Sequence, residues 1–221
     1  MYYGPSYLYF LQVVNGIDHT MKENLRYTGD PERLYDFMDE FTVHCHKCDG
    51  KAEVSIPSHF DYKNAVLKCT SCHYSEKAID RIRHKPTGKA KCHQCLEFLD
   101  LTVLKGYKSI PSYVNITCKY CKTINKVNEN WEPYIAKYHD SGIIDLAFGL
   151  PLWYQDIVKG NIIWAFNMRH LTEIKNYVKS TLRERTTDKF KMTMVEKLPD
   201  FIKMAKNREE VLKALQGMVS K

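Results

Sequence analysis

The residues of this sequence whose type and spacing could do chemistry are its eight cysteines. They form four Cys-x-x-Cys pairs, namely Cys45 with Cys48, Cys69 with Cys72, Cys92 with Cys95, and Cys118 with Cys121. Such a turn lets two thiolates converge on one tetrahedral ion, and a hairpin can bring up a second pair. Twenty residues separate the first two pairs and twenty-two separate the last two. The spacing therefore predicts two Zn²⁺ sites with four cysteines each.

These sites are expected to be structural, because four thiolates saturate zinc and leave no position for water. Disulfides are disfavoured because the apolar stretch from Tyr7 to Val14 is too short for a signal peptide and lacks a basic leader. A redox Cys-x-x-Cys would open a helix in a βαβ pattern, which none of the four pairs does. Four cysteines can also hold an iron–sulfur cluster, but evenly paired hairpin spacing favours zinc.

The cysteine-rich region looks like an internal duplication with a period of 47 residues, since His44-Cys45-His46-Lys47-Cys48 aligns with Lys91-Cys92-His93-Gln94-Cys95. Over about residues 43 to 130 the chain resembles the zinc-ribbon superfamily. That resemblance implies a three-stranded sheet for each zinc ion and a role in binding nucleic acid or protein. The part from Gly149 to Leu215 resembles uncharacterised bacterial proteins with N-terminal zinc ribbons, and this resemblance implies no function.

The predicted fold class is α+β, with two tandem zinc ribbons, which are small antiparallel sheets, flanked by an N-terminal helix and a mainly helical C-terminal domain. We expect an N-terminal segment at 1–42, ribbon 1 at 43–84, ribbon 2 at 85–130, and the C-terminal domain at 131–221. β-Branched and aromatic residues predict the ribbon strands, which we place at 51–57, 64–68, 76–84, 97–107, 113–117 and 123–128.

Helices are predicted on both sides of the ribbons. Asp30 followed by Pro31 is typical of a helix start, and the apolar residues after it predict a helix over about 31–41. Residues 168–185 predict a second helix with an apolar face of Leu171, Ile174, Val178 and Leu182.

The net charge depends on the metal. The formal value is +7 with neutral cysteines, but two Zn²⁺ ions and eight thiolates lower it to about +3. No apolar run approaches the roughly 18 residues of a membrane span. We therefore expect a cytoplasmic protein without a membrane partner, and the oligomeric state is left open.

Two groups of basic residues could contact phosphates. The first lies around the junction of the ribbons and comprises Lys77, Arg81, Arg83, Lys85, Lys89 and Lys91. The second follows one face of the predicted C-terminal helix and comprises Lys175, Lys179 and Arg183. Solvated surface is the alternative interpretation for both groups. Tyr107, Tyr113 and Tyr120 could also stack on unpaired bases, or serve as half-buried partners between strands.

The sequence favours a protein that is not an enzyme and that binds DNA or RNA through these residues. The alternative is an adaptor, inhibitor, immunity protein or antitoxin that recognises a protein partner. A minor alternative is a metal-dependent nuclease, since Asp156 precedes Glu173-Ile174-Lys175 in an order that such enzymes use around a divalent ion. In those enzymes the Glu-x-Lys lies on a strand, whereas here it falls in a helical pattern.

Overall fold

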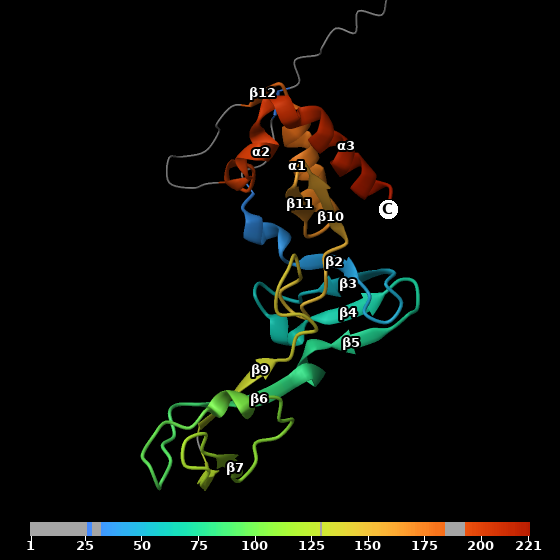
Figure 1. Ribbon diagram of the computed structural model, residues 1–221. Helices are drawn as coiled ribbons and strands as arrows, with labels where there is room; N and C mark the ends of the chain where they lie inside the picture. Colours follow the sequence, from blue (N-terminus) through green and yellow to red (C-terminus); the bar gives the residue numbers. More distant parts are fainter. Residues whose placement is uncertain (1–25, 28–31, 129, 184–192) are drawn as a thin grey trace, which may run out of the picture.

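The computed structural model describes residues 26–27, 32–128, 130–183 and 193–221. Its parts are stacked along one long axis (Figure 1): the C-terminal helices lie at one end, a four-stranded sheet in the middle, and a second cysteine-rich unit at the other end. The predicted α+β class, with small antiparallel sheets and C-terminal helices, is confirmed. Among the described residues, no helix has the length and apolar character needed to cross a membrane.

Ribbon 1 is an antiparallel sheet in the order β2 (Glu40–His44), β3 (Lys51–Ser55), β4 (Val66–Cys69) and β5 (Ser75–Lys77). In β3, Ala52 and Val54 are buried while Glu53 is exposed, as the period of two in a strand requires. The segment predicted as one strand at 76–84 is divided by a 3-10 turn, Ala78–Arg81, after which the chain leaves this sheet.

The helix predicted over about 31–41 is wrong in the part that the structure describes. A 3-10 turn covers only Leu34–Phe37, and β2 already begins at Glu40. The β-branched residues Thr42 and Val43 pair with distant segments, and these tertiary hydrogen bonds outweigh the local apolar spacing that fits a helix. Asp30 and Pro31 lie outside the described residues.

Ribbon 1 and the C-terminal region share one hydrophobic core. The backbone N–H of Thr42 donates to the carbonyl of Phe166 at 2.7 Å, and the N–H of Trp153 donates to the carbonyl of Thr42 at 2.9 Å. Val43 forms an antiparallel bridge with Leu152. The common core includes Phe37, Val54, Leu67, Tyr154, Leu171 and Leu215, all buried. Ribbon 1 is therefore part of a larger folding unit.

The C-terminal region contains the predicted helices and, in addition, a hairpin of strands. A hairpin of β10 (Tyr154–Val158) and β11 (Asn161–Ala165) precedes three helices, α1 (Met168–Lys179), α2 (Asp200–Lys203) and α3 (Arg208–Val219). Asn167 caps α1 by accepting from the N–H of His170 at 2.9 Å.

Helix α1 buries the predicted face of Leu171, Ile174 and Val178, but it ends at Lys179. The helix stops before Ser180, whose backbone is extended, with φ −70° and ψ 137°. The chain then forms β12 (Leu182–Arg183), which pairs in parallel with β1 (Arg26–Tyr27). The helix predicted to reach 185 is thus shorter.

Ribbon 2 is joined to the rest by a two-stranded antiparallel stalk of β6 (Ile82–Thr87) and β9 (Asn130–Ile135). Ribbon 2 has a hairpin of β7 (Val114–Thr117) and β8 (Ile124–Val127), and a small core of its own around Leu99, Leu104 and Ile116. The expected boundaries at 84/85 and 130/131 fall inside the two strands of the stalk.

The strand predicted at 97–107 is wrong. This segment has single bridges, at Phe98 and at Tyr107, and a 3-10 turn at Leu101–Val103. The carboxylate of Asp100 accepts from the N–H of Thr102 at 3.0 Å, and this local bond favours a turn over a strand.

His170 is expected to make stability depend on pH. Its ring is 2% exposed, stacks on Phe37 with centroids 5.0 Å apart, and accepts from the N–H of Phe166 at 3.2 Å. Burial lowers the pKa of His170 to about 4, because it penalises the charged form. The unfolded chain takes up this proton near pH 6.5 and the folded one does not, so stability is full above about pH 6.5 and falls toward pH 4.

The expected loss is about 3 kcal/mol by pH 4. Urea unfolding at several pH values should show this slope in the native protein, and His170→Gln should lack this contribution, so the difference in stability between the two proteins should change with pH. Equal slopes in both would contradict this assignment.

Candidate metal centres

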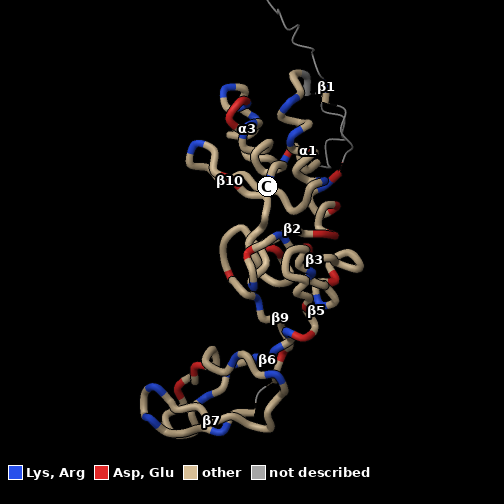
Figure 2. The backbone as a smooth tube through the Cα atoms, turned by 90° about the vertical axis from the view of Figure 1, so that its right-hand side faces the viewer, with Lys and Arg blue, Asp and Glu red and all other residues tan. Residues whose placement is uncertain are grey.

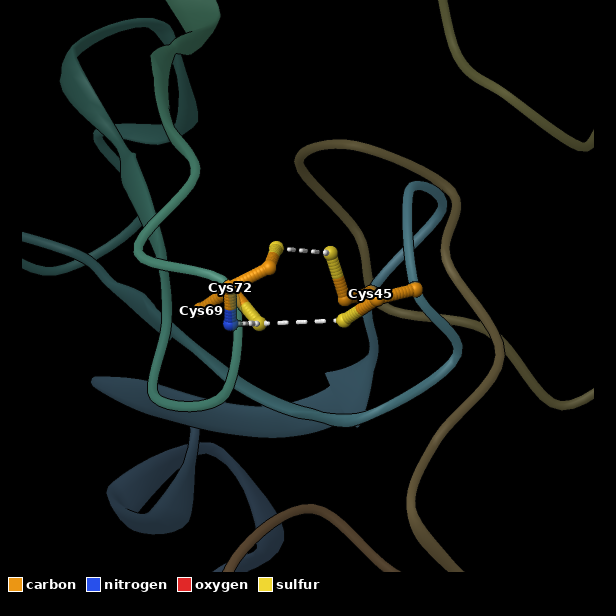
Figure 3. Close-up of side chains that lie close together, drawn as sticks. Cys45, Cys69 and Cys72 are labelled. Carbon is orange, nitrogen blue, oxygen red and sulfur yellow. Dashed lines mark hydrogen bonds between the residues drawn. The ribbon is translucent and has the colours of Figure 1, made fainter.

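The first four-cysteine site joins two turns of ribbon 1. Cys45 and Cys48 lie between β2 and β3, whereas Cys69 ends β4 and Cys72 lies in the turn before β5. The sulfurs of Cys45 and Cys72 are 3.8 Å apart, and those of Cys48 and Cys69 are 3.6 Å apart. Figure 3 shows the thiols of the two turns facing each other. A tetrahedral ion with Zn–S bonds of about 2.3 Å would hold its sulfurs about 3.8 Å apart.

The second site repeats this geometry in ribbon 2. The sulfurs of Cys92 and Cys121 are 3.5 Å apart, and those of Cys95 and Cys118 are 3.6 Å apart. In each site all four sulfurs lie within 4.8 Å of one another. A disulfide would need about 2.0 Å, and an iron–sulfur cluster would hold its thiolates further apart because irons and sulfides lie between them. The residues fit two structural zinc ions, as predicted.

All four Cys-x-x-Cys turns share one backbone conformation. The residue after the second cysteine has a positive φ in each, and these residues are Asp49, His73, Leu96 and Lys122, with φ between 58° and 63°. The carbonyl of the first cysteine accepts from this residue in three turns, for example from Leu96 to Cys92 at 2.9 Å. Because none of the four is glycine, the sequence carried no signal for this turn.

Backbone N–H groups aimed at sulfur prepare each site for a metal. The N–H groups of Cys72 and Ser71 lie 3.4 Å from the Cys69 sulfur and lower the pKa of Cys69 to about 6. The N–H of Cys95, followed by that of Gln94, likewise lowers the pKa of Cys92 to about 6. Each site thus offers a thiolate at neutral pH, the form that binds zinc.

Asn125 supports the second site and was missed by the sequence analysis. It is 3% exposed, and its amide lies 3.5 Å from the Cys92 sulfur. Its carbonyl oxygen accepts from the N–H of His93 at 2.9 Å. The backbone of His93 therefore orients a group that contacts a ligand of the second site.

Arg81, one of the predicted phosphate contacts, is held inside the protein. Its guanidinium pairs with Glu76 at 3.1 Å, donates to the carbonyl of Ala136 at 2.6 Å, and lies 3.7 Å from the ring centroid of Tyr138. The side chains of Arg81 and Glu76 are only 16% and 17% exposed. Tyr138 donates to Glu76 at 2.7 Å and stacks on His46, beside the first zinc site. This cluster fastens the chain after β9 to ribbon 1.

Replacing Arg81 should therefore reduce stability. Arg81→Gln leaves the carboxylate of Glu76 without its positively charged partner, so we expect the free energy of unfolding to fall by about 3 kcal/mol. Chemical denaturation measures this, with Lys77→Gln on the exposed end of β5 as the control. Equal stability of the two variants would contradict the structural role of Arg81. A loss of oligonucleotide binding without destabilisation would instead indicate that Arg81 contacts phosphates.

The other basic residues near the stalk remain at the surface. Arg83 donates to its own neighbours, the carbonyls of Asp80 and Ile82, and Lys85 pairs with Glu132 at 2.8 Å. Lys89 and Lys91 lie on ribbon 2, and the ammonium group of each is close to a half-exposed ring, Phe98.

The second predicted group does not join the first. Lys175 and Lys179 lie on α1, at the opposite end of the molecule from ribbon 2 (Figure 1). Lys175 donates to the side-chain carbonyl of Gln216 at 2.6 Å. Arg183 lies in β12, and its side chain is outside the described part of the chain. A ligand that contacts both groups would have to span the long axis.

The residues of the minor nuclease alternative are also separate. Asp156 is exposed on β10, whereas Glu173 lies on α1 and accepts from the hydroxyl of Tyr27. Within the described residues, the only groups of three or more candidate ligands are the two cysteine tetrads. The Glu-x-Lys lies on a helix, as its sequence pattern predicted.

Fold and sites together define an α+β protein with two zinc-ribbon-like four-cysteine sites. Comparisons with protein-family models, with curated proteins and with solved structures found no match for the chain. The function is therefore inferred from the charges and side chains at the protein surface.

Proposed function

We propose that this protein binds nucleic acid through ribbon 2, with both zinc ions in structural roles. The observation that carries the proposal is the concentration of positive charge on that unit. Three acidic residues lie between 85 and 130, against eight lysines: Lys85, Lys89, Lys91, Lys105, Lys108, Lys119, Lys122 and Lys126. Figure 2 shows the basic positions spread around the unit that carries β7.

The charge of the zinc site does not cancel this excess. A zinc ion with four thiolates carries about −2, which leaves ribbon 2 near +3. The whole metal-bound chain is also near +3, so the remaining parts are close to neutral together. A compact basic unit at the end of a stalk can reach a polyanion without bringing the acidic residues of the middle part against it.

A salt titration with fluorescent oligonucleotides tests the proposal. Binding should be detectable at ~50 mM salt and weaken steeply as salt rises. Each phosphate contact contributes about 0.7–0.9 to the negative slope of log affinity against log salt concentration. Replacing Lys108, Lys119 and Lys126 together by glutamine should lower affinity more than about tenfold. The matched control replaces Lys175 and Lys179 at the opposite end and should leave affinity unchanged. An absence of binding at ~50 mM salt would reject the proposal.

One observation favours the alternative, recognition of a protein partner. Ile157 and Ile162 face each other across the β10–β11 hairpin and are 68% and 49% exposed. Exposed apolar pairs of this kind are typical of protein-binding surfaces. Ile157→Ser with Ile162→Ser should abolish partner binding if this alternative is right, and should leave oligonucleotide affinity intact if ribbon 2 is the interface.

A further inference from the structure

A groove of about 750 Å³ lies where the stalk meets ribbon 2. One wall comes from the end of β6, which includes Lys85, and from Lys89 in the loop after it, and the other from the segment of Phe98, Asp100 and Lys105. Resting on the proposed function, we propose that this groove receives one unpaired nucleotide of a single strand. The base stacks on Phe98, and Lys89 and Lys105 hold the adjoining phosphates.

Phe98 presents an exposed aromatic ring. It is 51% exposed, although a phenylalanine gains most from burial. Its backbone forms an antiparallel bridge with Lys91, which places Phe98 beside the first turn of the second zinc site. The ammonium groups of Lys89 and Lys91 lie 5.7 Å and 5.1 Å from the ring centroid. Stacking of a base on an aromatic ring contributes more binding free energy than an exposed cation–π contact does. A base can therefore displace the two ammonium groups from the ring, and these groups can then contact phosphates.

The acidic residues of the groove are already engaged. Asp100 accepts from both the N–H and the hydroxyl of Thr102, at 3.0 Å and 2.6 Å. Glu132 pairs with Lys85 at 2.8 Å. This pair is neutral, and Lys89 with Lys105 exceed Asp100 by one charge. The net charge lining the groove is therefore positive, which suits an anion.

The geometry selects unpaired bases. Bases of a duplex are stacked on one another inside the helix, so only an unpaired base can lie against Phe98. The volume is in the range of sites for single small ligands, about 300–1,000 Å³, and is too small for a duplex. Two more exposed rings, Tyr113 and Tyr120, extend over the same unit, with the ammonium groups of Lys126 and Lys119 4.9 Å and 5.0 Å from their centroids.

Fluorescence anisotropy on the zinc-loaded full chain tests this inference. The probes are single-stranded DNA and RNA of roughly 12 nucleotides and a DNA duplex of equal length. Phe98→Ala should weaken single-strand binding about 5- to 100-fold and leave duplex binding and the salt slope unchanged. Phe98→Trp should keep the single-strand affinity. Lys89→Gln with Lys105→Gln should lower the salt slope for the single-stranded probes and leave that of the duplex unchanged.

Val103→Ala is the matched control, because Val103 is a 66% exposed apolar side chain on the same unit. It should have no effect. Zinc content of every variant verifies that ribbon 2 is folded.

The outcomes separate the two proposals. If neither probe binds at ~50 mM salt, the proposed function fails and this inference with it. If single strand and duplex bind equally, or Phe98→Ala matches Val103→Ala, the stacking site is rejected while the nucleic-acid function stands. Loss confined to single strands in Phe98→Ala, with retention in Phe98→Trp, supports the site for whichever of DNA and RNA shows it.

Discussion

Cys69→Ser is expected to unfold ribbon 1 together with the C-terminal region. Cys69 and Cys45 belong to the same buried core as Leu171 and Leu215, and β2 is hydrogen-bonded to the segment before β10 and to Phe166. Zinc binding in small sites of this kind contributes about 10–16 kcal/mol of folding free energy, which equals or exceeds the stability of a typical domain. Loss of zinc from the first site should therefore unfold all the elements that share this core.

The matched variant is Cys92→Ser in the second site. Its surroundings form a separate small core, so we expect unfolding of ribbon 2 alone and retention of one zinc ion. Near-ultraviolet circular dichroism and amide spectra by NMR measure the extent of unfolding, and metal analysis counts the zinc. If both variants lost the same signals, the division into two cores would be wrong.

Deleting most of ribbon 2 is expected to leave a folded protein that no longer binds nucleic acid. Thr87 and Asn130 pair at the end of the stalk, with the Thr87 hydroxyl donating to the Asn130 carbonyl at 3.0 Å. An Asn-Gly turn can therefore replace residues 88–129 and close β6 and β9 into a hairpin. The main core contains no residue of that span among those described. Tyr107 packs on Trp131, so its loss should loosen only the stalk.

The measurements are metal content, cooperative unfolding in urea, and oligonucleotide anisotropy at ~50 mM salt. One zinc ion, a cooperative transition and complete loss of binding are the expected results. The full chain with Lys175→Gln and Lys179→Gln serves as the control and should bind normally. Binding by the shortened chain at the affinity of the full chain would place the interface outside ribbon 2.

The sequence predicted the metal sites well because their chemistry is local. Two cysteines in a turn supply two of the four ligands of a tetrahedral zinc ion. The spacing to the next turn indicates a hairpin that brings the other two ligands close. The inward face of α1 was likewise readable from the helical period of Leu171, Ile174 and Val178.

The same reasoning failed where distant pairing decides the structure. Thr42 bonds to Trp153 and Phe166, more than a hundred residues along the chain, and no local pattern carries that information. Arg81 is a neighbour in sequence of exposed basic residues, yet the turn before β6 directs its side chain to Glu76. Phe98 was assigned to a strand that does not form, so its exposed ring could not be foreseen.

The stalk also determines how the molecule approaches a charged partner. Because ribbon 2 carries the excess of positive charge at one end of an elongated body, the molecule has a permanent electric dipole along its long axis. The field of a polyanion exerts a torque on such a dipole and turns the basic end forward before contact. Association should therefore be faster at low ionic strength, and the advantage should shrink once the screening length falls to about 10 Å near 0.1 M salt.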